Sequence, residues 1–227
     1  MPFADLGERV AEIRGRVAMA QSRGGHGQRV EIVAVTKTHG VDAVVAAAEQ
    51  GIRLIGENRV QEALAKKAQT EVDVEWHLIG HLQRNKVKHL SEFAMLHSLD
   101  SARLASEVND FGLGSGRRVP VLVQVNVVGE ATKGGFDASE IGRVADDLTR
   151  MPGLEVRGAM TMAPYEADEG TLRNIFAATR DVAGRLRAAG HPATELSMGM
   201  SGDYEIAVEE GATLVRLGTI LFGARAT

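Results

Sequence analysis

The sequence of 227 residues contains no cysteine. This absence excludes disulfide bonds, a thiol nucleophile and a cysteine-ligated zinc site together. The sequence also lacks a strong excess of one charge, because 26 Lys and Arg stand against 30 Asp and Glu, giving a net charge of −4. Such a balance indicates neither a nucleic acid partner nor an anionic membrane surface.

Long apolar runs are missing as well. Residues 1–5 lack the apolar core of a signal peptide, and no stretch approaches the length of a membrane span. We therefore expect a cytoplasmic protein with no membrane partner. The length suits a substantial core, and residues 1–227 are predicted to form a single domain.

What the chain does contain is a regular alternation of short apolar strands and helical stretches. It begins with an amphipathic helix over residues 3–20, where apolar residues recur at steps of three and four. Strands are expected at 31–36, 52–56, 74–79, 94–99, 119–126, 155–162, 194–197 and 213–217. Helices are expected at 41–50, 58–69, 101–111, 138–150, 168–189 and 203–210. Eight strands, each followed by a helix and without a linker, predict an α/β fold, a (β/α)₈ TIM barrel with an extra N-terminal helix. A doubly wound open sheet is the alternative.

Local signals mark several boundaries of these elements. Three glycines suit left-handed C-terminal caps of helices: Gly51, Gly190 and Gly211. Three aspartates suit N-caps: Asp100, Asp137 and Asp168. The glycine-rich residues 112–116 precede a strand instead of following one, so they predict a flexible connector and not a dinucleotide-binding loop.

Lys37 ends the apolar run of residues 32–36, where an amine would emerge from a core into a site. Desolvation there would lower its pKa and favour the nucleophilic form. The alternative is a lysine at the end of a strand that reaches water. In a barrel, however, the C-terminal ends of the strands converge on one mouth, and function is expected there. Four other lysines lie in polar, helix-like stretches and are expected to be solvated: Lys66, Lys67, Lys86 and Lys88.

Two turns of small residues follow the seventh and eighth strands. The first segment, residues 196–203, includes Ser201 and Gly202, and the second turn contains Gly218 and Thr219. Glycines allow a backbone to approach an anion closely, and N–H groups that begin a helix bind phosphate. An ordinary capped turn, with Ser201 or Asp203 as N-cap, is the alternative. Phosphate sites after strands seven and eight recur in barrels, so the two turns together favour a phosphate cup.

Arg216 lies on the last strand, two residues before Gly218. A buried arginine needs a partner, and a structural salt bridge is one interpretation. Opposite a lysine on the first strand and beside a phosphate cup, it would instead donate to a heterocyclic nitrogen. A lysine, a phosphate cup and a nitrogen partner are the three anchors expected for pyridoxal phosphate.

His77 and His81 are four residues apart, which raises the question of a metal site. The surrounding residues 76–80 are typical of a strand that runs into a glycine turn, and no carboxylate motif accompanies them. No metal is therefore expected, and His77 is interpreted as a packing or hydrogen-bonding residue. The basic stretch 84–88 is interpreted as a solvated helix face and not as a nucleic acid contact.

Taken together, these segments resemble the pyridoxal phosphate homeostasis proteins (YggS type). The resemblance rests on residues 34–38, 56–62, 76–86, 157–164, 196–201 and 215–223. It runs in order through nearly the whole chain. It implies a barrel like the N-terminal domain of alanine racemase, with pyridoxal 5′-phosphate bound to Lys37 as a Schiff base. One departure from the family's usual pattern is His39-Gly40, where a different residue and a proline are usual, and it concerns the loop after Lys37.

The resemblance also implies roles for other residues. The phosphate would be held by Ser201, Gly202, Gly218 and Thr219. Arg216 would face the pyridine nitrogen. The ring would be flanked by Asn58, His77 and Met160. The family's role is cofactor homeostasis by storage, buffering or delivery, which implies no catalytic residue, pyridoxal phosphate-dependent apoenzymes as recipients, and a monomer.

Two enzyme alternatives are weighed against a carrier. A weak amino-acid racemase would need a second acid or base opposite Lys37, and only Tyr165 and Tyr204 offer a phenol. Arginine does not readily give a proton to the ring nitrogen, which makes the ring a poorer electron sink. A barrel enzyme acting on sugar phosphates would use Lys37 without a cofactor. Lys133 is predicted to be a second amine at the mouth that assists cofactor release.

Overall fold

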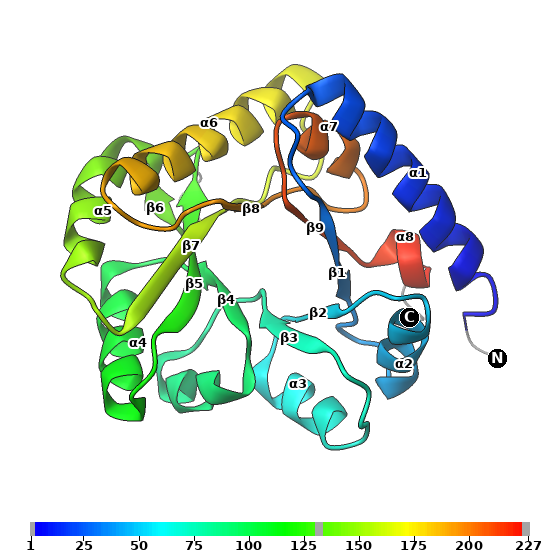
Figure 1. The fold of residues 1–227 in the computed structure, drawn as a ribbon, viewed down its shortest axis with the longest axis horizontal. Helices are drawn as coiled ribbons and strands as arrows, with labels where there is room; N and C mark the ends of the chain where they lie inside the picture. Colours follow the sequence, from blue (N-terminus) through cyan, green and yellow to red (C-terminus); the bar gives the residue numbers. More distant parts are fainter. Residues whose placement is uncertain (1–2, 130–133, 224–227) are drawn as a thin grey trace.

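Eight parallel strands close into a barrel, and helices surround it (Figure 1). The computed structural model describes residues 3–129 and 134–223. The barrel strands follow one another around the ring as β1 (Glu31–Val35), β2 (Leu54–Glu57), β3 (Glu75–Leu78), β4 (Met95–Leu99), β5 (Val119–Asn126), β7 (Leu154–Met160), β8 (Glu195–Ser197) and β9 (Leu214–Leu217). The pairings β9–β1 and β4–β5 close the ring, so the barrel prediction is confirmed and the open sheet is excluded. A short β6 (Phe136–Asp137) pairs with β5 as a ninth strand.

The helices form the outer layer of the barrel. They are α1 (Leu6–Gly24), α2 (Val41–Glu49), α3 (Val60–Lys67), α4 (Ala102–Ser115), α5 (Ile141–Thr149), α6 (Glu169–Ala188), α7 (Tyr204–Glu209) and α8 (Thr219–Phe222), with 3₁₀ helices η1 (Arg84–Glu92) and η2 (Ala138–Glu140). The extra N-terminal helix is present as α1 and packs beside α7 and α8 (Figure 1). None of the helices in residues 3–129 and 134–223 is long and apolar enough to cross a membrane.

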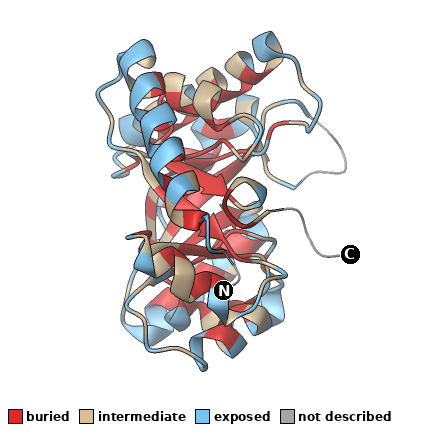
Figure 2. Ribbon diagram, turned by 90° about the vertical axis from the view of Figure 1, so that its right-hand side faces the viewer, coloured by how far each residue is buried: buried red, intermediate tan, exposed pale blue. Residues whose placement is uncertain are grey.

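The core has two layers, as alternation along a strand requires. On β5, Val121 and Val123 face the helices, whereas Leu122 points inside the barrel. The interior cluster is formed by Val33, Val35, Ile79, Met95, Leu122, Met160 and Leu214. Figure 2 shows these buried strands enclosed by helices whose outer faces are exposed.

Most of the predicted boundaries agree with the structure. Gly51, Gly190 and Gly211 all have positive φ angles. Asp137 and Asp168 cap η2 and α6 through their side chains. The N-cap of α4 is wrong by one residue, because Ser101 and not Asp100 accepts the Leu104 N–H.

The predicted connector at residues 112–116 is wrong. Helix α4 continues to Ser115, and Gly116 ends it with φ +66°. Gly112 is required for close packing, since a Cβ there would lie 2.3 Å from the carbonyl oxygen of Gly153. Gly112 therefore allows close approach of α4 to the backbone at Gly153, and Gly116 ends the helix. Neither glycine belongs to a linker.

Candidate functional site

Lys37 lies at the C-terminal mouth of the barrel, two residues beyond the end of β1, and is half-buried. Its strand is flanked by β2 and β9, and Ala34 pairs with Leu217 of β9. The turn after β9 is therefore adjacent to the turn that carries Lys37. A Cβ on Gly218 would lie 3.4 Å from the Val35 carbonyl oxygen, which shows how closely the two strand ends approach.

The loop after β8 and the turn after β9 form one cup. Ser201 Oγ accepts from the backbone N–H of Gly218 at 3.4 Å and of Ile220 at 3.3 Å. A Cβ on Gly202 would meet no atom within 4 Å, so open space lies beside its backbone. Thr219 begins α8 and is exposed at the same turn. Backbone N–H groups and hydroxyls that converge beside open space suit a phosphate group.

Arg216 lies under this cup, buried inside the barrel. Its Nη1 donates to the carbonyl and to the hydroxyl of Ser197, both at 2.7 Å, and its Nη2 donates to the Thr161 carbonyl at 2.8 Å. Within the described residues, these bonds use three of the five N–H groups of the guanidinium, and the other two are left for a ligand. Burial lowers the pKa of Arg216 to about 10, and the nearby Asp203 opposes the shift. The side chain therefore stays charged at neutral pH.

Asn58 and Met160 lie near the same end of the barrel. Asn58 directly follows β2 and packs against Gly80, where a Cβ would lie 2.4 Å from the Asn58 carbonyl oxygen. Met160 ends β7, pairs with Ser197 and is fully buried in the barrel interior. Both residues therefore lie toward the end of the barrel that carries Lys37.

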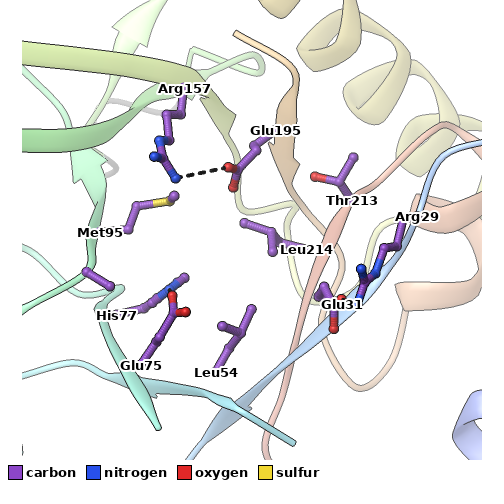
Figure 3. Close-up of a pocket in the computed structure, with 11 residues that line it drawn as sticks. Arg29, Glu31, Leu54, Glu75, His77, Met95, Arg157, Glu195, Thr213 and Leu214 are labelled. Atoms are coloured by element: carbon purple, nitrogen blue, oxygen red, sulfur yellow. Dashed lines mark ion pairs between the residues drawn. The ribbon is translucent and has the colours of Figure 1, made fainter. Parts of the chain in front are cut away.

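The structure does not bring His77 to this mouth. His77 lies deeper in β3 and lines a cavity of about 280 Å³ formed by residues from the starts of the strands (Figure 3). Its Nδ1 lies 2.8 Å from Nε2 of His97. His81 is on the outside, 2.8 Å from Asp100, so the two histidines do not share a site. His77 therefore lies apart from Lys37 and the cup, at the opposite end of the barrel interior.

Lys66 is buried, contrary to the prediction that it is solvated. It is 5% exposed, and its ammonium group donates to the Thr36 carbonyl at 2.7 Å, to Glu57 at 2.6 Å and to Glu62 at 2.9 Å. We call Thr36, Glu57, Glu62 and Lys66 the Lys66 cluster. The spacing of four residues between Glu62 and Lys66 is the sequence signal for one ion pair, whereas the contact with Glu57 of β2 depends on the fold.

The Lys66 cluster holds the backbone on both sides of Lys37. Thr36, which precedes Lys37, donates its hydroxyl proton to Glu57. Thr38, which follows Lys37, donates its backbone N–H to Glu62 at 2.7 Å. Thr38 has φ +70°, a strained conformation for a β-branched residue. Such strain persists only where the surrounding structure determines it, and here α3 supplies the contacts.

The departure at His39-Gly40 leaves the loop well supported. The His39 ring packs 5.3 Å from the ring of Phe222 and 5.8 Å from that of Phe3. Gly40 has φ −73°, within the range of proline, so the backbone keeps a conformation that the family's usual residue would adopt.

Of the other predicted residues, neither tyrosine faces Lys37 from a buried position. Tyr165 is 97% exposed, and Tyr204 is buried near Arg16, where α7 meets α1 on the outside of the barrel. Lys133 lies outside the described residues.

Comparison with known proteins agrees with this geometry. The family model "Alanine racemase, N-terminal domain" matches residues 9–226. The pyridoxal phosphate homeostasis protein of Aquifex aeolicus is 38% identical over 96% of this chain and 97% of its own. The pyridoxal phosphate homeostasis protein of Pseudomonas aeruginosa is 36% identical over 98% of this chain and 97% of its own.

Solved structures give the same result. PipY of Synechococcus elongatus, solved with PLP bound, has a TM-score of 0.84 at 35% identity. The match covers 96% of this chain and 100% of the PipY chain. A D-threonine aldolase from Filomicrobium marinum shares the fold alone, at 16% identity and a TM-score of 0.75 over 100% of this chain and 63% of its own. The chain therefore belongs to the family of pyridoxal phosphate homeostasis proteins, built on the alanine racemase N-terminal domain.

Proposed function

We propose that this protein binds pyridoxal 5′-phosphate and acts in its homeostasis inside the cell, by storage, buffering or delivery to apoenzymes. The observation that carries the proposal is the meeting of Lys37, the Ser201–Gly218 cup and Arg216 at one mouth, on the neighbouring strands β1, β9 and β8. The relatives that match nearly the full length of this chain are named for this role, and PipY was solved with PLP bound.

The residues present fit this cofactor. The Lys37 amine would condense with the aldehyde to a Schiff base, releasing water. Open space beside Gly202 and the hydroxyls of Ser201 and Thr219 suit the phosphate, which would take the place of Ser201 Oγ as the acceptor for the Gly218 N–H. Arg216 keeps two N–H groups for the pyridine nitrogen, and Asn58 and Met160 would flank the ring.

The same site favours a carrier over an enzyme. Pyridoxal phosphate supplies an electron sink when its ring nitrogen is protonated. Arg216 holds its own proton at neutral pH, so it donates a hydrogen bond without transferring the proton. Neither tyrosine is placed as a second acid or base opposite Lys37. Fold neighbours include enzymes, so the fold alone does not separate the two classes.

The first test is Lys37→Ala. We expect the purified protein, loaded with pyridoxal phosphate, to keep a visible Schiff-base absorbance through desalting. Lys37→Ala should lose this absorbance, because the amine that forms the bond to the cofactor aldehyde is removed. Lys67→Ala, which changes an exposed lysine of α3, is the control and should stay coloured. A wild-type protein that cannot be loaded would contradict the proposal.

A second test separates the carrier from a racemase. The loaded protein is incubated with single enantiomers of alanine and serine in deuterated water, and free pyridoxal phosphate at equal concentration is the control. We expect α-proton exchange no faster than with the free cofactor, because neither Tyr165 nor Tyr204 is placed as a second acid or base opposite Lys37. Rapid exchange with loss of optical activity would overturn the carrier assignment.

A further inference from the structure

A chain of hydrogen bonds runs through the barrel interior to Arg216. His77 Nδ1 lies 2.8 Å from His97 Nε2, and His97 Nδ1 lies 2.8 Å from Ser197 Oγ. Ser197 Oγ in turn accepts from Arg216 Nη1 at 2.7 Å. We call His77, His97, Ser197 and Arg216 the axial chain. Its members belong to β3, β4, β8 and β9, and each is at most 4% exposed.

The proton positions along the axial chain follow from chemistry. Arginine only donates, so the Ser197 hydroxyl accepts from Arg216 and must place its own proton elsewhere. Its remaining partner among the described residues is His97 Nδ1, which therefore accepts. A neutral His97 then carries its proton on Nε2 and donates to Nδ1 of His77. The opposite arrangement would bury the Ser197 proton without an acceptor, which is costly.

Both histidines are neutral in this environment. Burial, reinforced by Arg157, lowers the pKa of His77 to about 4. Burial, with His77 and Arg216 beside it, lowers the pKa of His97 well below its ordinary value. Each ring therefore holds one proton at neutral pH, and every bond of the axial chain points away from Arg216.

His77, the member of the axial chain farthest from Arg216, lines the cavity of Figure 3. The remaining proton of His77 is on Nε2, which lies 3.9 Å from the carboxylate of Glu75. The cavity wall there also carries Arg157, whose guanidinium lies 3.8 Å from Glu195 (Figure 3). The axial chain thus connects His77, at the cavity among the strand starts, with Arg216, beneath the cup at the opposite mouth.

We propose that His97 and His77, acting through Ser197, are positioning residues for Arg216 in the cofactor site. His97 fixes the rotation of the Ser197 hydroxyl, Ser197 fixes Nη1 of Arg216, and His77 fixes the tautomer of His97. The two N–H groups that Arg216 keeps for a ligand are thereby aimed before any ligand arrives. This inference rests on the proposed cofactor site, in which Arg216 faces the pyridine nitrogen.

The first experiment needs no cofactor. Long-range ¹H–¹⁵N correlation spectra of the cofactor-free protein report the tautomer of each histidine, with His77→Asn and His97→Asn used for assignment. We expect both rings to be neutral and protonated on Nε2 at pH 7. A ring protonated on Nδ1, or one that exchanges between tautomers, would overturn the axial chain whether or not the protein binds pyridoxal phosphate.

The second experiment measures the effect on the cofactor. His97→Leu removes the acceptor for Ser197, whereas His97→Asn keeps an acceptor oxygen near the position of Nδ1. We expect His97→Leu to weaken affinity for pyridoxal phosphate about three- to tenfold, the worth of roughly one hydrogen bond, and to shift the absorption maximum of the bound cofactor. His97→Asn should restore most of both.

The matched control is His191→Leu, which alters a half-buried histidine bonded to the Ala145 carbonyl on the outer layer. It should change neither readout. An unchanged absorption maximum and affinity in His97→Leu, with folding verified by circular dichroism, would overturn the positioning role. That outcome differs from failure of the cofactor site itself, in which the wild-type protein would not take up the cofactor at all.

Discussion

Lys66→Met should lower the free energy of unfolding by about 3–5 kcal/mol at pH 7, the usual cost of removing one partner from a buried ion pair. Glu57 is fully buried, and its Oε1 accepts from Lys66 and Thr36. Its Oε2 has no partner within the described residues. Without Lys66 the carboxylate keeps only the Thr36 hydroxyl, and its charge is left uncompensated. Urea unfolding at equilibrium measures the loss.

The neighbouring lysine supplies the control. Lys67 is on the same helix and pairs with Glu92 at 2.8 Å, but both side chains are about two-fifths exposed. Lys67→Met should cost less than about 1 kcal/mol, because exposed ion pairs contribute little. Equal losses in the two variants would contradict the structural role of the Lys66 cluster.

The charge of Glu57 provides a further check on the same prediction. Burial already raises the pKa of Glu57, against the opposing hydrogen bonds from Lys66 and Thr36. Removal of Lys66 raises the pKa of Glu57 further, so Glu57 takes up a proton more readily and the destabilisation should shrink as the pH is lowered from 7. Lys66→Met combined with Glu57→Gln should recover part of the stability at pH 7, because no buried charge remains.

The sequence was sufficient to predict the barrel, because runs of β-branched residues mark the strands and capping residues mark the helices between them. It was also sufficient to place Lys37 and the turns after β8 and β9 at one end of the barrel, since the C-terminal ends of parallel strands meet at one mouth. It was insufficient for Lys66, whose partner Glu57 belongs to β2, outside the helix that carries the lysine. A polar helix pattern cannot show that a strand end presents a buried carboxylate.

The same limit applies to His77 and His97. They are 20 residues apart, and they meet only because β3 and β4 pair with His77 opposite Met95. Alternation assigns His77 to the barrel interior, but the depth of a residue along the barrel axis depends on strand register. His77 was therefore expected at the mouth, whereas the register places it at the level of the opposite cavity.

His77 should make the protein sensitive to mild acid. In the unfolded chain a histidine takes up a proton near pH 6.5, whereas burial and Arg157 lower the pKa of folded His77 to about 4. Between these values the unfolded state binds more protons, so stability falls as the pH falls. The shift corresponds to about 3 kcal/mol, fully present above pH 6.5 and lost progressively down to pH 4. Urea unfolding measured from pH 7.5 to pH 4 follows this loss.

The comparison with His77→Asn isolates this contribution. Asparagine keeps an acceptor oxygen for the His97 proton but does not titrate in this range. Glu57, Glu195 and Asp203, whose pKa values are raised by burial, act in the opposite direction, yet they are present in both proteins. The difference in unfolding free energy between wild type and variant should therefore move in the variant's favour by about 3 kcal/mol from pH 7.5 to pH 4. A constant difference over that range would show that folded His77 takes up a proton as readily as the unfolded chain, and would contradict the lowered pKa.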